Sequence, residues 1–130
     1  MHPEPLAVHE DDSLVTVAVR MARARLRHAC VVNGEGRVIG ILSDRDLRRA
    51  FGDPRRASVL ERESALAAMW RVRDVMTEKP HSVHEDDSVE TAARALATNR
   101  LGALPVVGDD WRLHGIVSYI DVLEYFARAQ

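Results

Sequence analysis

Cysteine and lysine are almost absent from this chain of 130 residues, which contains only Cys30 and only Lys79. A single cysteine excludes an internal disulfide and a metal site built from several thiolates. Because Cys30 lies in an apolar stretch, we expect a buried small hydrophobe and not a reactive thiol. No serine, cysteine or lysine stands at a recognisable motif spacing from a base. The sequence therefore predicts a protein that is not an enzyme and needs no catalytic cofactor.

Long apolar runs and basic blocks are missing as well. No run approaches the roughly 18 residues of a membrane span, and the first five residues lack the charged-then-apolar form of a signal peptide. The formal net charge of -2 gives no overall attraction to nucleic acid or to an anionic membrane. We therefore expect a cytoplasmic globular protein without a membrane or nucleic-acid partner, and a nucleic-acid role ranks behind the alternatives below.

An internal repeat is the strongest feature that is present. A shift of 75 positions aligns residues 1–51 with 76–126 without a gap, so that the run HEDDS at 9–13 falls on HEDDS at 84–88. The sequence predicts a first repeat at 1–51, a linker at 52–75 and a second repeat at 76–130. Such small units bury too little surface to be stable alone, so we expect a pseudo-symmetric pair packed through its sheets.

Each repeat is predicted to run strand, helix, strand, strand, helix, which places the protein in the α/β (α+β) class. In the first repeat the strands are expected at 6–8, 28–32 and 37–42, with Ser13 capping the helix between the first two and Ser88 doing the same in the second repeat. In the linker, a capping box at 58–61 predicts a helix toward Trp70, followed by an extended segment at 71–75. Leu66, Met69 and Trp70 would share a face that covers the core.

The HEDD run before each of these helices contains residue types that bind metals. One histidine per run has no partner at ligand spacing, whereas carboxylates ahead of a helix complement the helix dipole. We expect the dipole role and no metal.

A strand-to-helix corner occurs once in each repeat, as Ser43-x-x-Asp46 and as Ser118-x-x-Asp121. Such a corner collects backbone N–H groups at the positive end of a helix dipole, which suits it to phosphate or to ribose hydroxyls. The same spacing is that of a capping box, which would contribute only about 0.5–2 kcal/mol to helix stability. From the spacing alone, both interpretations stand.

Three motifs, taken together, carry a family resemblance: the two Gly-Ile-(Leu/Val)-Ser-x-x-Asp-(Leu/Val) segments, the segment VRDVMTxxP at 72–80, and LPVV at 104–107. Over essentially its whole length the chain resembles the paired cystathionine-β-synthase (CBS) domains, or Bateman module. The resemblance implies a regulatory sensor that binds AMP, ADP, ATP, S-adenosylmethionine or NAD in a cleft between the repeats. It also implies a homodimer, and an unidentified protein that receives the signal.

By that resemblance the corner aspartates Asp46 and Asp121 would accept hydrogen bonds from a ribose diol, as suits a carboxylate. The serines beside them would supply hydroxyls, and Arg45 a forked cation for phosphate. In the related modules each cleft joins the corner of one repeat to the first strand of the other. The first cleft would then hold His28, Ile41, Ser43, Arg45, Asp46, Thr77 and Ser82, and the second Ser118 and Asp121 opposite His2 and Ala7.

The two corners differ in charge. Arg45 of the first corner aligns with Ile120 of the second, and the bulky Tyr119 precedes Ile120. We therefore expect one main nucleotide site, built on Asp46. Arg45 could also be a solvated cation next to Asp44, and His28 a packed strand-end residue.

A different class of function remains open. The closing helices carry Phe51 in the first repeat and Tyr125 and Phe126 in the second. A ligand-free module that dimerises or docks on a partner through these faces is the alternative to a sensor.

Overall fold

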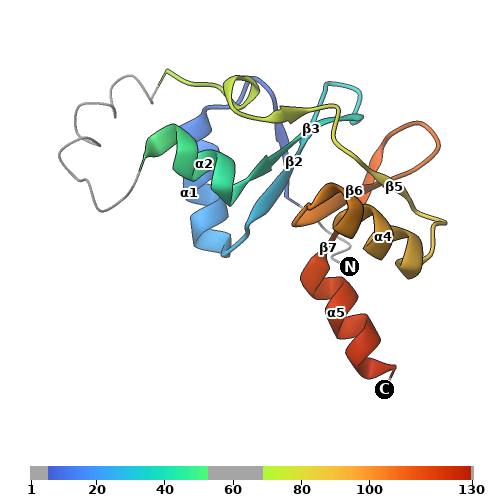
Figure 1. Ribbon diagram of the computed structural model, residues 1–130. Coiled ribbons are helices and arrows are strands. Elements are labelled where there is room, and N and C mark those ends of the chain that lie inside the picture. The colour runs from blue at the N-terminus through green and yellow to red at the C-terminus, as the bar shows by residue number, and fades with distance from the viewer. Residues whose placement is uncertain (1–5, 53–68, 130) are drawn as a thin grey trace.

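The computed structural model describes residues 6–52 and 69–129 and has a mixed α/β fold (Figure 1). The first repeat contains β1 (Ala7–His9), α1 (Leu14–Ala24), β2 (His28–Val32), β3 (Val38–Ser43) and α2 (Asp44–Phe51). The second repeat contains β5 (Val83–His84), α4 (Val89–Asn99), β6 (Ala103–Val107), β7 (Leu113–Ser118) and α5 (Tyr119–Arg128). The predicted fold class and the order strand, helix, strand, strand, helix are therefore confirmed in both repeats.

Serine caps set the start of the first helix in each repeat. The Ser13 hydroxyl accepts a hydrogen bond from the Thr16 N–H at 3.4 Å, and the Ser88 hydroxyl accepts one from the Thr91 N–H at 3.1 Å. Both helices end in a residue with left-handed backbone conformation, Arg25 and Arg100, which again lie 75 positions apart. The repeat in the sequence is thus a repeat in the local geometry.

The first sheet has the order β1-β2-β3-β4, and the second has the order β5-β6-β7. In each sheet the first pair is parallel and the next is antiparallel. The strand β4 (Thr77–Glu78) follows the linker, yet it pairs antiparallel with β3, where Thr77 lies opposite Ile41. The strand β4, which belongs to the second repeat by the 75-residue shift, therefore completes the sheet of the first repeat.

The two sheets meet at a small apolar contact. Val32, Val38 and Val107 form one buried cluster with Leu113 against it. The Val38 N–H donates to the Trp111 carbonyl at 2.9 Å, and the residues Arg37 and Arg112 form an isolated bridge. Because 37 and 112 are equivalent positions, the pseudo-twofold axis passes close to this bridge.

Each repeat also has a core of its own. Cys30 lies buried in β2, and burial raises the pKa of its thiol to about 12, so that it remains a neutral hydrophobe as expected.

No helix in the described ranges, 6–52 and 69–129, has the length and the apolar character needed to cross a bilayer.

The predicted linker needs two corrections. Residues 71–75 are not extended but contain a turn of 3₁₀ helix, η1 (Val72–Asp74), because the Asp74 carboxylate accepts the Arg71 N–H at 2.8 Å. Met69 is 75% exposed and covers no core, whereas Trp70 packs on the first core with its ring 6.0 Å from that of Phe51. The predicted capping box at 58–61 and Leu66 lie outside the described residues.

The close approach of β4 to β3 depends on Gly40. A Cβ at this position would lie 2.8 Å from the Met76 sulfur and 3.1 Å from the Thr77 carbonyl oxygen. We expect Gly40→Ala to displace β4 and to lower the free energy of unfolding by about 1–3 kcal/mol, as overpacking does. Urea denaturation measures the change, with Gly34→Ala as the control, because nothing lies within 4 Å of a Cβ there. Equal stability of the two variants would contradict the role given to Gly40.

Candidate functional site

A cavity of about 750 Å³ opens between the two repeats. Its walls come from the start of β2, the end of β3, the first turns of α2, the segment around β4, and the corner between α4 and β6. The residues that line it are Arg27, His28, Ile41, Ser43, Asp44, Arg45, Asp46, Arg48, Thr77, Glu78, Lys79, Pro80, His81, Arg100, Leu101, Gly102 and Ala103.

Strand pairing explains why these residues meet. In the antiparallel pair of β2 and β3, His28 lies opposite Ser43, and in the pair of β3 and β4, Ile41 lies opposite Thr77. The helix α2 starts directly after β3, so Asp46 stands one turn beyond the sheet. The local order of strand, corner and helix thus places three strands and one helix start around the same opening.

Both strand-to-helix corners form complete capping boxes. The Asp46 N–H donates to the Ser43 hydroxyl at 3.1 Å, and the Ser43 N–H donates to the Asp46 carboxylate at 2.9 Å. At the second corner, Ser118 and Asp121 repeat this exchange at 3.2 and 2.8 Å. The cap interpretation is therefore confirmed for both corners. At Asp46 the cap engages the Oδ2 atom, and a carboxylate has two oxygens with about four lone pairs, so capping and ligand binding are compatible.

The lining of the cavity carries more positive than negative charge. Its five permanent cations are Arg27, Arg45, Arg48, Lys79 and Arg100, and its three carboxylates are those of Asp44, Asp46 and Glu78. Arg48 is paired with Asp44 at 2.8 Å. The whole chain has a formal net charge of -2, so positive charge is concentrated here against the overall balance. Such a lining can hold an anion of the size of a phosphate group.

His28 connects the two repeats inside this cavity. A Cβ at Gly102 would lie 3.0 Å from the Nε2 atom of His28, so the imidazole ring packs tightly against the α4–β6 corner. Burial lowers the pKa of His28, and the nearby Asp46 carboxylate opposes this in part. A neutral imidazole at neutral pH offers one donor and one acceptor to a ligand.

The structure brings together six of the nine predicted site residues: His28, Ile41, Ser43, Arg45, Asp46 and Thr77. Ser82 does not belong to the described lining. Ser118 and Asp121 stand at the corner of the second repeat, and Asp121 lines a separate cavity of about 260 Å³. The predicted partner of that corner, His2, lies outside the described residues.

Sequence reasoning missed most of the cations. Lys79 was noted only as the single lysine, and Arg100 and Arg27 were not assigned to the site. Arg100 comes from the α4–β6 corner, which reaches the cavity across the pseudo-twofold axis. The internal repeat could have pointed to Arg100. If the two repeats pack as a pair, the first cleft contains the corner of one repeat and also the helix-to-strand turn of the other.

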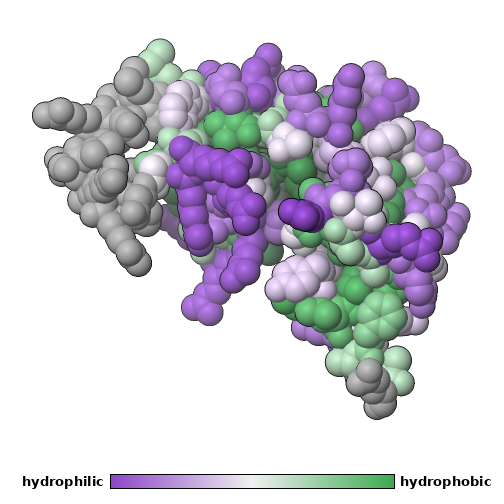
Figure 2. Space-filling model, viewed as in Figure 1, coloured by the Kyte–Doolittle hydropathy of each residue, from purple (hydrophilic) through white to green (hydrophobic). Residues whose placement is uncertain are grey.

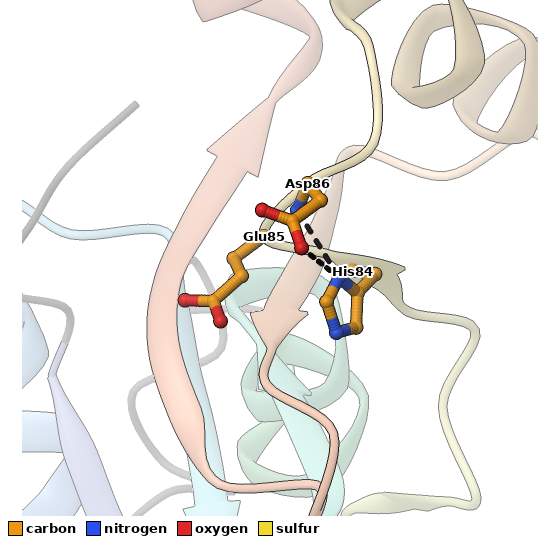
Figure 3. A group of neighbouring side chains, drawn as sticks. All are labelled: His84, Glu85 and Asp86. Carbon is orange, nitrogen blue, oxygen red and sulfur yellow. Dashed lines mark hydrogen bonds and ion pairs between the residues drawn. The ribbon is translucent and has the colours of Figure 1, made fainter.

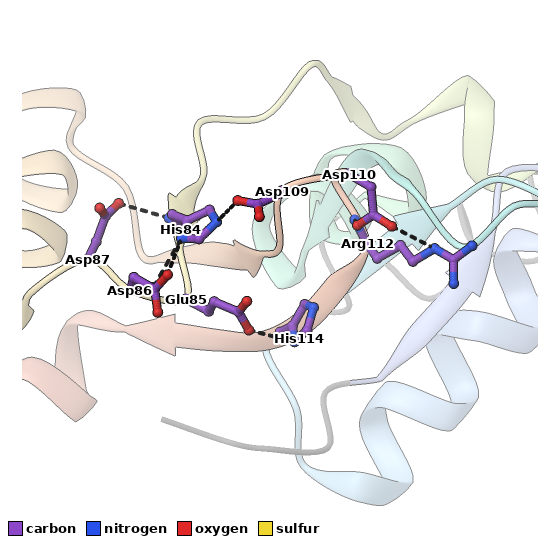
Figure 4. A network of polar contacts seen from close by, with 8 residues as sticks. All are labelled: His84, Glu85, Asp86, Asp87, Asp109, Asp110, Arg112 and His114. Carbon is purple, nitrogen blue, oxygen red and sulfur yellow. Dashed lines mark hydrogen bonds and ion pairs between the residues drawn. The ribbon is translucent and has the colours of Figure 1, made fainter.

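The HEDD run of the second repeat forms a polar network and not an isolated cluster. His84, Glu85 and Asp86 place their ligand atoms within 4.8 Å of one another (Figure 3). However, both ring nitrogens of His84 have protein partners: Nε2 lies 2.6 Å from the Asp109 carboxylate, and Nδ1 accepts the Asp86 N–H at 3.1 Å. The Glu85 carboxylate lies 2.9 Å from the His114 ring (Figure 4). The run is thus linked by its side chains to Asp109 and His114 in the loop and strand opposite.

Comparison with known proteins assigns both repeats to one class of domain. The family model described as CBS domain matches residues 1–53 and 72–128. The uncharacterised protein MJ1225 of Methanocaldococcus jannaschii is 35% identical over 122 residues, which are 89% of this chain and 41% of that protein. The present chain is thus less than half as long as that relative. The crystal structure of MJ1225 superposes with a TM-score of 0.82 at 28% identity, covering 97% of this chain and 45% of the other.

Two further solved structures have nucleotide complexes. The cytosolic domain of the Mg²⁺ channel MgtE, crystallised with ATP, is 32% identical, with a TM-score of 0.73 and coverage of 95% of this chain and 45% of that one. CBSX2 of Arabidopsis thaliana has a TM-score of 0.87 at 24% identity, covering 99% and 92% of the two chains, and its complex with AMP has a TM-score of 0.79. The CBSX2 likeness establishes the fold.

Two histidines should give the stability opposite dependences on pH. The folded-state pKa of His28 is lowered by burial, so the unfolded chain binds the proton more readily and stability falls as pH drops below about 6.5. The pKa of His84 is raised by its hydrogen bond with Asp109, so its contribution is present below about 6.5 and is lost as pH rises through the raised pKa.

Urea denaturation of His28→Gln and His84→Gln at pH 5 and pH 8 tests both signs. Relative to the unsubstituted protein, we expect His28→Gln to lose less stability on acidification and His84→Gln to lose more. Changes of the same sign in the two variants would contradict the assignment.

Proposed function

The chain belongs to the CBS domain family, and from that premise we propose that it is a regulatory sensor which binds an adenosine-containing nucleotide in the cavity between its two repeats. The observation that carries the proposal is the cavity's lining: five permanent cations surround the Ser43–Asp46 corner in a protein of net negative charge. The ATP complex of the MgtE cytosolic domain, which is 32% identical, supports the same ligand class.

Each part of the nucleotide is bound by residues of suitable chemistry. The Asp46 carboxylate accepts hydrogen bonds from the ribose diol, since it is acceptor-only and would repel a phosphate. Arg45, Lys79 and Arg100 hold the phosphates together with the Ser43 hydroxyl at the start of α2. Two side chains that face each other across β3 and β4, those of Ile41 and Thr77, flank the remaining part of the ligand.

One main site follows from the unequal corners. Position 45 is an arginine, whereas its equivalent, Ile120, is an exposed apolar residue. The corner at Asp121 therefore has the same capping geometry, with an isoleucine at position 120 where the first corner has Arg45. This difference makes the second corner a control for the first.

Thermal unfolding with AMP, ADP, ATP, S-adenosylmethionine or NAD tests the proposal, with Asp46→Asn and Asp121→Asn in parallel. A ligand at about 100 times its dissociation constant should add roughly 2.7 kcal/mol, which raises the midpoint by several degrees. Both variants should lose a similar amount of stability without ligand, because both caps are weakened. Only Asp46→Asn should abolish the ligand-induced shift.

Two outcomes would refute the proposed site. One is the absence of a shift with every compound at millimolar concentration. The other is a shift that survives Asp46→Asn and disappears in Asp121→Asn, which would move the site to the second corner.

A homodimer formed through α5 is the second candidate function, and one observation favours it. Five large apolar or aromatic side chains of this helix are exposed, and Figure 2 shows hydrophobic side chains gathered over it. They are Tyr119, Ile120, Leu123, Tyr125 and Phe126. The equivalent helix α2 instead carries exposed arginines at 45, 48 and 49. A patch of this kind marks an interaction site, and self-association would bury it.

Sedimentation velocity of Leu123→Glu tests this candidate, since a charge in an apolar interface is costly. We expect the variant to shift toward the monomer. The matched control is Arg48→Glu, at the equivalent position of α2, which should sediment like the unsubstituted protein. If the unsubstituted protein is a monomer at high concentration, the dimer is wrong and the sensor proposal is unaffected.

A further inference from the structure

The second repeat contains a groove that is separate from the nucleotide cavity. It has a volume of about 260 Å³ and lies between β5, α4 and α5. Its apolar lining consists of Val83, Val89, Ala92, Val106, Val117 and Val122. The lining also includes the acidic residues Glu85, Asp87 and Glu124 and one permanent cation, Arg128.

The equivalent place in the first repeat is filled. The six counterparts, each 75 positions earlier, are Val8, Leu14, Val17, Val31, Leu42 and Leu47, and all belong to one core cluster. Val72 of the linker is a fully buried member of the same cluster, and Trp70 and Val75 pack against it. The segment 70–75 therefore fills this place in the first repeat, whereas no segment within residues 6–52 and 69–129 fills the equivalent groove of the second repeat.

Backbone hydrogen bonds hold this segment in place. The Val72 N–H donates to the Asp12 carbonyl at 3.0 Å, the Leu14 N–H donates to the Trp70 carbonyl at 3.0 Å, and the Arg73 N–H donates to the Glu10 carbonyl at 2.9 Å. Their counterparts in the second repeat are Asp87, Val89 and Glu85, and these three residues line the open groove. Within ranges 6–52 and 69–129, no segment makes the equivalent bonds to them.

Charge completes the match. The Arg71 guanidinium donates to the Asp11 carbonyl at 2.9 Å, and Arg73 forms an ion pair with the Asp11 carboxylate. The counterpart of Asp11 is Asp86, whose side chain is 87% exposed beside Glu85 (Figure 3). The second repeat thus presents an acidic edge at the place where the first repeat receives two arginines.

We propose that this groove binds a peptide segment of a partner protein with the pattern of residues 70–75: an aromatic or aliphatic residue, arginine, valine, arginine, aspartate, valine. The valine between the arginines enters the apolar groove, as Val72 does in the first repeat, and the arginines meet Asp86. Main-chain groups pair with Glu85, Asp87 and Val89. The proposal does not depend on nucleotide binding, because no residue that lines this groove also lines the nucleotide cavity.

The test uses a capped synthetic peptide, Trp-Arg-Val-Arg-Asp-Val-Met, which copies residues 70–76, titrated into the isotope-labelled full chain and followed by NMR. We expect amide signals of Val83, Val89 and Ala92 to shift. A peptide carrying Val72→Asp should bind at least tenfold more weakly, because a carboxylate would enter the apolar groove. A peptide with both arginines replaced by glutamate should also bind at least tenfold more weakly.

A protein variant tests the acidic edge without disturbing the core. Asp86→Arg should weaken the peptide at least fivefold, whereas Glu35→Arg, an exposed charge reversal in the first repeat, should leave its affinity unchanged. Four results would overturn the proposal. The first two are that no amide signal shifts at millimolar peptide, or that the signals of Val8 and Leu14 shift instead. The other two are that the peptide binds only after residues 1–5 are deleted, or only when dilution dissociates a dimer. The last two would assign the groove to the chain's own N-terminus or to a second copy.

Discussion

The antiparallel pairing of β3 with strands on both of its sides is the constraint on which the rest of the structure depends. On one side β2 brings His28 opposite Ser43, and on the other β4 brings Thr77 opposite Ile41. The hydrogen bonds that build the sheet therefore also build the walls of the cavity. Stability and site geometry are properties of the same ladder, so a change that loosens β4 alters both.

Capping and the proposed ligand binding use the same two side chains at the Ser43–Asp46 corner. The reciprocal hydrogen bonds of the capping box fix the aspartate with respect to the sheet, and a fixed acceptor loses little conformational entropy when a ligand arrives. The two repeats have kept this corner equally well while their surroundings have diverged in charge. Arg45 corresponds to Ile120, and the charged helix α2 corresponds to the apolar helix α5. In the proposed function, the differences between equivalent positions separate the nucleotide site from its copy.

Much of the fold could be predicted because its signals are local and occur twice. Ser13 and Ser88 predict the starts of their helices, and the apolar run at 29–32 predicts a strand. The site corner was predictable for the same reason. The turn at η1 was not predicted, because it depends on a hydrogen bond from the Arg71 N–H to the Asp74 side chain that the apolar pattern does not report. Arg100 was missed because it reaches the cavity from the α4–β6 corner of the other repeat, far from Asp46 in the sequence, whereas Lys79 follows Thr77 closely and could have been assigned with it. Ser82 was assigned through the family resemblance and lies outside the described lining. Met69 was placed on the core by helical spacing, which does not show which residues at the end of a segment are covered.

The buried position of Val72 has a consequence for folding during synthesis on the ribosome. The core around Leu14 and Leu42 lacks one of its members until the chain has been synthesised past the linker, and its sheet lacks β4 until Glu78 has appeared. During vectorial synthesis the first repeat can form its helices as it leaves the ribosome, since these are local. It cannot close its core at residue 51. The nascent first repeat must wait for about a further half of its own length to emerge, and during that interval the apolar groove around Leu14 is open to chaperones.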